Sequence, residues 1–145
     1  MKSVYPVIFT QIEDERNTVL IEVPDLKIFT EGYGMSNAIE MARDAIGLAG
    51  ITLDDIGKEI PKPSDRRDIH LEETEFVKEG RQFISLVDID FTAYRRKVDT
   101  KSVRRNVTLP NWLNREAEKA NINVSRVLQE ALMKKMNLYL YYIIN

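Results

Sequence analysis

Apolar and polar residues alternate in several short runs along the first two thirds of the chain. Such alternation predicts strands at residues 4–10, 18–23, 27–31 and 83–91. Short polar turns separate the first three runs, which predicts an antiparallel meander. Pro6 lacks a backbone N–H, so the first strand is expected at a sheet edge or with its start near this residue.

The spacing of apolar residues changes to three and four between residues 35 and 49. This spacing predicts a helix with one apolar face, which the sheet would cover. Gly50 is expected to end the helix, and a second short helix is expected over residues 52–57. Residues 60–82 are polar without a clear period and predict mostly loop. The front of the chain therefore predicts the order β-β-β-α-β.

A short alternating run lies further along, at residues 103–109, and is closed by Pro110. It predicts a strand without a partner in the sequence around it, because two helical patterns follow over residues 111–120 and 124–136. Ser125 is expected to cap the second helix. An isolated pair of strands is marginally stable at best, so we expect the strand to pair with its equivalent in a second copy of the chain.

One face of such a two-stranded ribbon would carry Arg104, Asn106 and Thr108. A β-ribbon fits the major groove of DNA, where arginine reads guanine, asparagine reads adenine and threonine accepts either role. Residues near the ribbon and at the start of the last helix are candidates for phosphate contacts: Lys101, Arg105, Ser125 and Arg126. By alternation Arg105 falls on the opposite face, with Val103 and Val107. The alternative is a solvated strand face in an ordinary hairpin.

The balance of acidic and basic residues differs between the front and the back of the chain. Residues 1–98 hold 13 Lys and Arg against 19 Asp and Glu, whereas residues 99–145 hold 8 against 4. An acidic front and a basic back predict two modules with different partners. We expect a front domain over residues 1–91, a charged linker over 92–101 and a back domain over 102–145.

Composition narrows the classes of protein further. Hydrophobic residues make up 43% of the chain and charged residues 30%, which is typical of a globular domain. The absence of cysteine excludes disulfides and thiolate metal sites and fits a cytoplasmic protein. Residues 138–144 form an apolar tail that is far shorter than the roughly 20 residues of a membrane span. We expect this tail to pack at a subunit interface or against the front domain.

Catalysis has one candidate site among the carboxylates of the front domain. Asp88 and Asp90 alternate on one predicted strand, and Asp25 or Glu31 could lie close to them. Clustered carboxylates hold divalent metals in nucleases, so a metal-dependent nuclease is the enzymatic alternative. His70 is the only histidine and lies in a polar loop without metal-ligand spacing, so a solvated side chain is expected. We predict no catalytic residue, metal or cofactor.

Several motifs of the front and back occur together, in order, in one known family. They are Tyr5-Pro6-Val7-Ile8-Phe9, Val23-Pro24-Asp25-Leu26, Thr30-Glu31-Gly32, Ala38-Ile39-Glu40-Met41-Ala42, Ile60-Pro61-Lys62-Pro63-Ser64, Val87-Asp88-Ile89-Asp90, Asn106-Val107-Thr108-Leu109-Pro110 and Ser125-Arg126-Val127-Leu128-Gln129-Glu130-Ala131-Leu132. In these motifs the chain resembles HicB antitoxins that have a ribbon-helix-helix DNA-binding domain. The residues from 65 to 82 and the apolar tail match no motif of that family.

The resemblance implies an α+β protein in which a partial RNase H-like domain precedes a ribbon-helix-helix dimerisation domain. It implies that the front binds and masks a HicA-like toxin, a small basic mRNA endoribonuclease. It also implies that a homodimer binds operator DNA and represses its own operon. Exposed acidic residues of the front are the candidates for toxin contact: Asp25, Glu31, Asp88 and Asp90. A ribbon-helix-helix repressor whose front senses a small molecule is a further alternative.

Overall fold

The computed structural model describes residues 1–138, and the chain divides into two compact units, Met1–Thr100 and Lys101–Asn145. The apolar tail predicted to pack at a subunit interface or against the front domain lies outside the described residues, apart from Leu138. Within residues 1–138 no helix is long and apolar enough to span a membrane.

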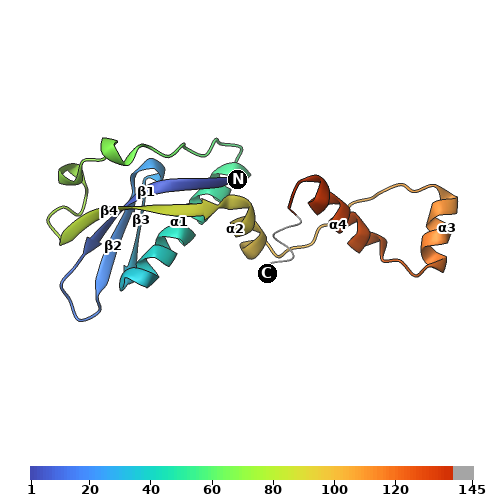
Figure 1. Ribbon diagram of the computed structural model, residues 1–145, viewed down its shortest axis with the longest axis horizontal. Coiled ribbons are helices and arrows are strands. Elements are labelled where there is room, and N and C mark those ends of the chain that lie inside the picture. The colour runs from blue at the N-terminus through green and yellow to red at the C-terminus, as the bar shows by residue number, and fades with distance from the viewer. Residues whose placement is uncertain (139–145) are drawn as a thin grey trace. The chain divides into compact units, whose positions relative to one another are not determined.

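The first unit is built on one antiparallel sheet of four strands (Figure 1). The strands are β1 (Lys2–Gln11), β2 (Thr18–Val23), β3 (Ile28–Tyr33) and β4 (Arg81–Asp90), in the order β3-β2-β1-β4. The predicted meander is confirmed. The edge placement predicted for β1 is wrong, because β4 returns to its free side. Pro6 is tolerated because this half of β1 pairs only with β4; the register with β2 begins at Ile8.

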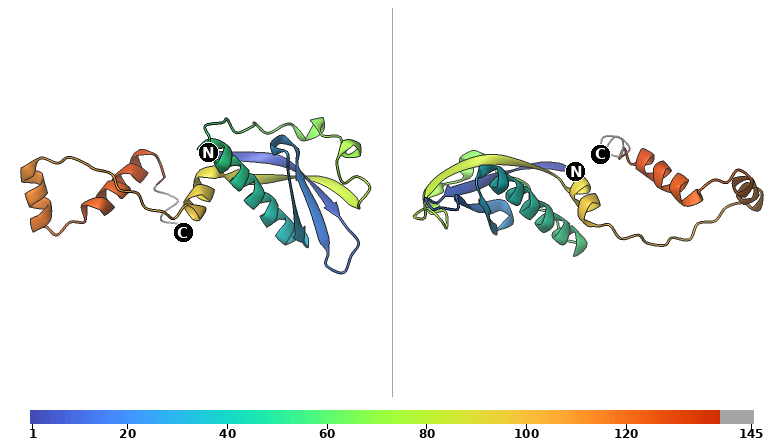
Figure 2. Two further views of the ribbon diagram at one scale, coloured as in Figure 1. Left: turned by 180° about the vertical axis from the view of Figure 1, so that it is seen from behind. Right: turned by 90° about the horizontal axis from the view of Figure 1, so that it is seen from below.

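Helix α1 (Met35–Asp55) packs along one face of the sheet (Figure 2). Alternate strand residues face it, and together they make the buried core of the unit: Tyr5, Val7, Phe9, Val19, Ile21, Val23, Val87 and Ile89 from the sheet, with Ala38, Ala42 and Ile46 from the helix. The predicted helix is confirmed, but its predicted end at Gly50 is wrong. The helix continues to Asp55, so residues 52–55 belong to it and not to a separate helix.

A second helix, α2 (Phe91–Val98), follows β4 directly. The linker predicted at residues 92–101 is therefore wrong over most of its length, and the boundary between units falls at Thr100. Asp90 starts the helix, because its side chain accepts hydrogen bonds from the backbone N–H groups of Thr92 and Ala93, both at 3.1 Å. Arg95 then joins α2 to the end of α1 by ion pairs with Asp54 and Asp55, each at 2.8 Å.

Residues 58–80, which we call the strap, connect α1 to β4. They are irregular apart from two short 3-10 turns, η2 (Arg66–Asp68) and η3 (Leu71–Glu73), as the polar pattern predicts. The strap is tied to the sheet at several points. The Tyr5 hydroxyl donates to the carbonyl of Pro61 at 2.7 Å, and the Phe76 ring packs edge-on against Phe29 with centroids 5.5 Å apart. Phe29 points away from the α1 side, so the strap reaches the sheet face opposite α1.

The second unit contains α3 (Asn111–Lys119) and α4 (Val124–Lys135), close to the predicted bounds. Residues 99–110 form neither helix nor strand in the single chain. The strand predicted at residues 103–109 is expected to form by pairing with a second copy of the chain, and it stays a prediction. Ser125 does not cap α4. The cap is Asn123, whose side chain accepts from the backbone N–H of Arg126 at 3.1 Å.

Candidate functional site

The four carboxylates predicted to contact the toxin lie in three parts of the first unit, because Asp88 and Asp90 share the end of β4. Asp25, in the short turn η1 (Pro24–Leu26), accepts hydrogen bonds from the N–H and the hydroxyl of Ser64 on the strap. Glu31 on β3 accepts from the Tyr33 hydroxyl at 3.1 Å. Asp90 is the α2 cap and lies 3.7 Å from the N-terminal ammonium group. No three metal-binding side chains converge anywhere in residues 1–138.

Asp88 lies on β4, an edge strand, and α1 reaches it through Arg43. The guanidinium Nη2 is 2.8 Å from the Asp88 carboxylate, and Nε donates to the Asp88 carbonyl at 3.1 Å. The hydrogen bond and the charge of Arg43 lower the pKa of Asp88 below its ordinary value. Asp88 remains exposed, and so does Leu86, which precedes it on the same face. Its expected contact with a toxin stays a prediction.

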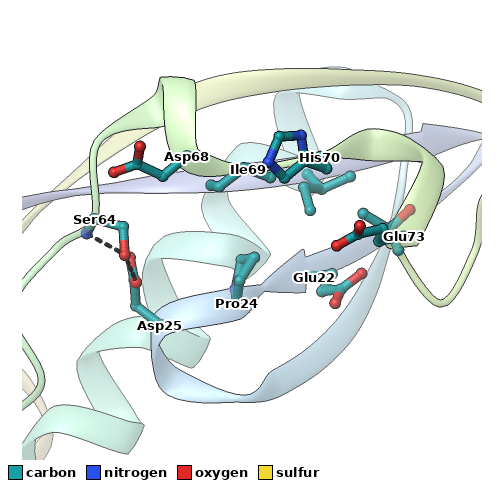
Figure 3. A pocket seen from close by; sticks show the side chains of 10 residues that line it. Glu22, Pro24, Asp25, Ser64, Asp68, Ile69, His70 and Glu73 are labelled. Carbon is teal, nitrogen blue, oxygen red and sulfur yellow. Dashed lines mark hydrogen bonds between the residues drawn. The ribbon is translucent and has the colours of Figure 1, made fainter.

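A pocket of about 270 Å³ lies between the sheet and the strap. Its walls come from three parts of the unit: Ile8 and Glu22 from the sheet, Pro24 and Asp25 from η1, and Ser64, Asp68, Ile69, His70, Glu73 and Thr74 from the strap. Figure 3 shows Glu22 and Glu73 at one end and Asp25 with Ser64 at the other. The lining contains four carboxylates and no lysine or arginine.

Glu22 has the least ordinary environment in the pocket. Its Oε2 atom is buried and has no hydrogen-bond partner in the described part of the chain. Burial raises the pKa of Glu22, and the nearby charge of Glu75 adds to the effect, against the opposing influence of the Glu75 backbone N–H. A buried acceptor without a donor is costly, so this carboxyl is a candidate for contact with an external donor.

The sequence does not predict this pocket. One signal was available, since Glu22 is the single charged residue in the β2 run Thr18–Val23. A charge there is compatible with an exposed strand face, and only the path of the strap converts that face into a pocket. His70 borders the pocket, and its Nδ1 is 3.8 Å from the Glu72 carboxylate. The side chain of His70 is exposed, as expected for a solvated histidine.

The candidate DNA contacts lie in the second unit. Lys101, Arg104, Arg105, Asn106 and Thr108 are all exposed in the irregular segment before α3. Their roles in reading bases and binding phosphates depend on the predicted ribbon and stay predictions. Beyond that segment, Ser125 and Arg126 lie in the first turn of α4. Arg126 forms an ion pair there with Glu130, whose carboxylate lies 3.1 Å from the arginine Nε.

Apolar side chains of the second unit are left uncovered. Within residues 101–138 no residue is buried, although both helices have an apolar face. Trp112 is 66% exposed, Val127 52% and Leu132 49%. A module with helices and no core is incomplete by itself, because burial of apolar surface is the main stabilising term in folding.

Comparison with known proteins shows which family the chain belongs to. Residues 5–132 match the sequence profile of a family described as the HicB-like antitoxin of bacterial toxin-antitoxin systems. The chain belongs to the HicB-like antitoxin family. The match spans both units, so the resemblance seen in the sequence motifs is confirmed at the level of the family. The antitoxin matches no curated protein.

Two solved structures are similar to the antitoxin. One is a chain of a toxin-antitoxin complex from Streptococcus pneumoniae, with 24% identity and a TM-score of 0.59, covering 93% of this chain and 99% of that one. The other is the Burkholderia pseudomallei antitoxin HicB, with 20% identity and a TM-score of 0.47, covering 93% and 97%. The first similarity shows that the mixed α+β fold is shared. The RNase H-like and ribbon-helix-helix arrangements stay predictions.

Proposed function

We propose that the antitoxin binds and masks a HicA-like mRNA endoribonuclease through its first unit and represses its own operon through its second. The observation that supports this proposal most strongly is the family match over residues 5–132, which includes both units. Each activity is a binding event, so no catalytic group is required of this chain.

The charge of the first unit suits the proposed toxin. Acidic residues outnumber basic ones by six over residues 1–98, and a basic nuclease would be attracted to such a surface. Complementary charge speeds association and disfavours wrong partners more than it raises affinity. Asp25, Glu31, Asp88 and Asp90 remain the candidate contacts, of which the exposed Asp88 beside Leu86 offers both charge and apolar surface.

The second unit supports a dimer as the DNA-binding form. A second copy of residues 101–138 would cover apolar side chains that one copy leaves exposed, such as Leu113 and Leu132. Pairing of the two segments at residues 103–109 would supply the backbone partners that each lacks alone. The ribbon would then present Arg104, Asn106 and Thr108 to the bases, with Lys101, Arg105, Ser125 and Arg126 near the phosphates.

The proposal is tested by mixing the antitoxin with a HicA-like protein, if one is encoded beside its gene, and with a DNA fragment from the promoter of the antitoxin gene. We expect a toxin complex to elute as one species from a gel-filtration column, and the promoter fragment to be retarded in a native gel. An antitoxin that is dimeric and folded but retains neither partner would contradict the proposal.

A further inference from the structure

The pocket between sheet and strap has features of a receptor for a positively charged side chain. Four carboxylates line it, from Glu22, Asp25, Asp68 and Glu73, and no lysine or arginine does. Of these, Asp25 is satisfied by Ser64. Glu22 is not, because its buried Oε2 has no donor in the described chain. The pocket therefore combines a negative lining with an acceptor that lacks its partner.

We propose that this pocket receives an arginine side chain of the toxin, whose guanidinium hydrogen-bonds Glu22. The inference rests on the proposed function, because it names the contact through which the first unit would hold its partner. It adds a residue that the sequence did not single out. Glu22 lies on the inner strand β2, whereas Glu31 and Asp88 lie on the edge strands β3 and β4. Of the carboxylates expected from the sequence, Asp25 also lines this pocket.

The lining favours an arginine over a simple cation. Ile8, Pro24 and Ile69 supply apolar wall, which suits the three methylenes of an arginine stem. Glu22 and Glu73 supply acceptors at one end, and a planar guanidinium with five N–H donors binds two carboxylates in fixed geometry. A metal ion is less well suited, since no metal-binding group of three side chains is found in the described residues.

The charges around Glu22 also favour an arginine side chain in the pocket. The negative charge of Glu75 on the strap acts on Glu22, and Glu73, also on the strap, lies at the same end of the pocket (Figure 3). His70 is the only basic side chain in the lining, and it is exposed beside Glu72. A guanidinium would relieve the mutual repulsion of these carboxylates, and burial would strengthen its attraction to Glu22.

The pocket is tested first without the toxin, by titrating the ¹⁵N-labelled full chain with N-acetyl-arginine amide. We expect the backbone amide signals of residues lining the pocket, such as Glu22, Ile69 and Thr74, to shift at millimolar probe. N-acetyl-citrulline amide has nearly the same shape without the charge and should cause no such shift. N-acetyl-lysine amide shows whether an ammonium group serves as well, and we expect it to bind more weakly.

The variant Glu22→Gln keeps the size of the side chain and removes its charge. It should weaken the arginine probe about tenfold or more, the effect of losing a charged hydrogen bond. Glu40→Gln is the matched control, since Glu40 is an exposed carboxylate on α1 outside the pocket. A native amide spectrum confirms that each variant is folded. Absence of pocket shifts, or equal shifts with citrulline or with Glu22→Gln, would overturn the inference.

The second arm uses the toxin itself. We expect Glu22→Gln to weaken toxin binding about tenfold or more, and Glu40→Gln to leave it unchanged. Equal binding by wild type and Glu22→Gln would overturn this inference and leave the proposed function intact. Failure of the wild-type chain to bind the toxin would instead overturn the proposed function.

Discussion

The backbone of Gly50 on α1 lies directly against the ring of Phe91, the first residue of α2. A Cβ added at Gly50 would overlap with Cε1 of that ring, and a Cβ added at Gly47 would be 2.5 Å from Cδ2 of Tyr94. The two glycines thus form the surface of α1 onto which α2 packs. Gly50 is needed for this close approach and does not end the helix.

Replacing Gly50 by alanine should lower the stability of the first unit by about 1–3 kcal/mol, since Phe91 must move out of a packed site. The direction of this stability change is informative, because a glycine-to-alanine substitution inside an unconstrained helix raises stability by up to about 1 kcal/mol. Urea unfolding followed by circular dichroism measures the change. Leu48→Ala, at an exposed position of the same helix, should change stability by less than about 0.5 kcal/mol. A more stable Gly50→Ala variant would refute the packing role.

The raised pKa of Glu22 predicts a specific pH dependence. The folded state binds this proton more tightly than the unfolded state, whose pKa is near 4.5. Ionised Glu22 therefore disfavours the folded state, and this effect grows as the pH rises from about 4.5 through the higher folded pKa. We expect Glu22→Gln to be more stable than wild type at pH 7, with little difference between them at pH 4. An advantage that is the same at both pH values would show that the charge is not its cause.

The uncovered helices of the second unit predict that its apolar residues hold a dimer together. Leu132→Asp should convert the chain to a monomer in analytical ultracentrifugation, because a charge cannot be buried in an apolar interface without large cost. Lys134→Asp, an exposed change on the same helix, should leave the dimer intact. A Leu132→Asp chain that stays dimeric would place the interface elsewhere.

The predicted ribbon separates residues that read bases from residues that bind phosphates. Asn106→Ala should cost about 1–3 kcal/mol of operator affinity and relax sequence preference, whereas Lys101→Ala should weaken all sequences alike. In Lys101→Ala the slope of log affinity against log salt should also become shallower, by roughly 0.9 for each phosphate that the variant no longer binds. Fluorescence anisotropy with operator and scrambled DNA measures each effect. Unchanged affinity and preference in Asn106→Ala would exclude the ribbon assignment.

The sequence predicts the sheet well because alternation is a local property. Tyr5, Val7 and Phe9 face α1 as their spacing requires, and Val87 and Ile89 face it from β4. Helix α2 could not be predicted in the same way. Arg95, Arg96 and Lys97 make its sequence resemble a linker, and the packing that holds it comes from α1.

The residues of the candidate site could likewise be predicted only in part from the sequence. Glu22 becomes unusual only because residues 64–74 of the strap, far along the chain, cover it. Asp90 resembles a surface carboxylate in the sequence, because its role as a helix cap depends on a helix that the sequence did not predict. The ribbon at residues 103–109 requires a second chain, so its support lies in what one chain leaves exposed: a unit with no buried residue among those described.

We propose that this antitoxin silences an mRNA endoribonuclease by binding it. The measurement that tests it is cleavage of a labelled mRNA by a HicA-like toxin, at a fixed toxin concentration well above the dissociation constant, with increasing antitoxin. We predict that cleavage falls linearly and stops when each toxin molecule has one antitoxin chain. Cleavage that continues undiminished at an excess of folded antitoxin would contradict the account.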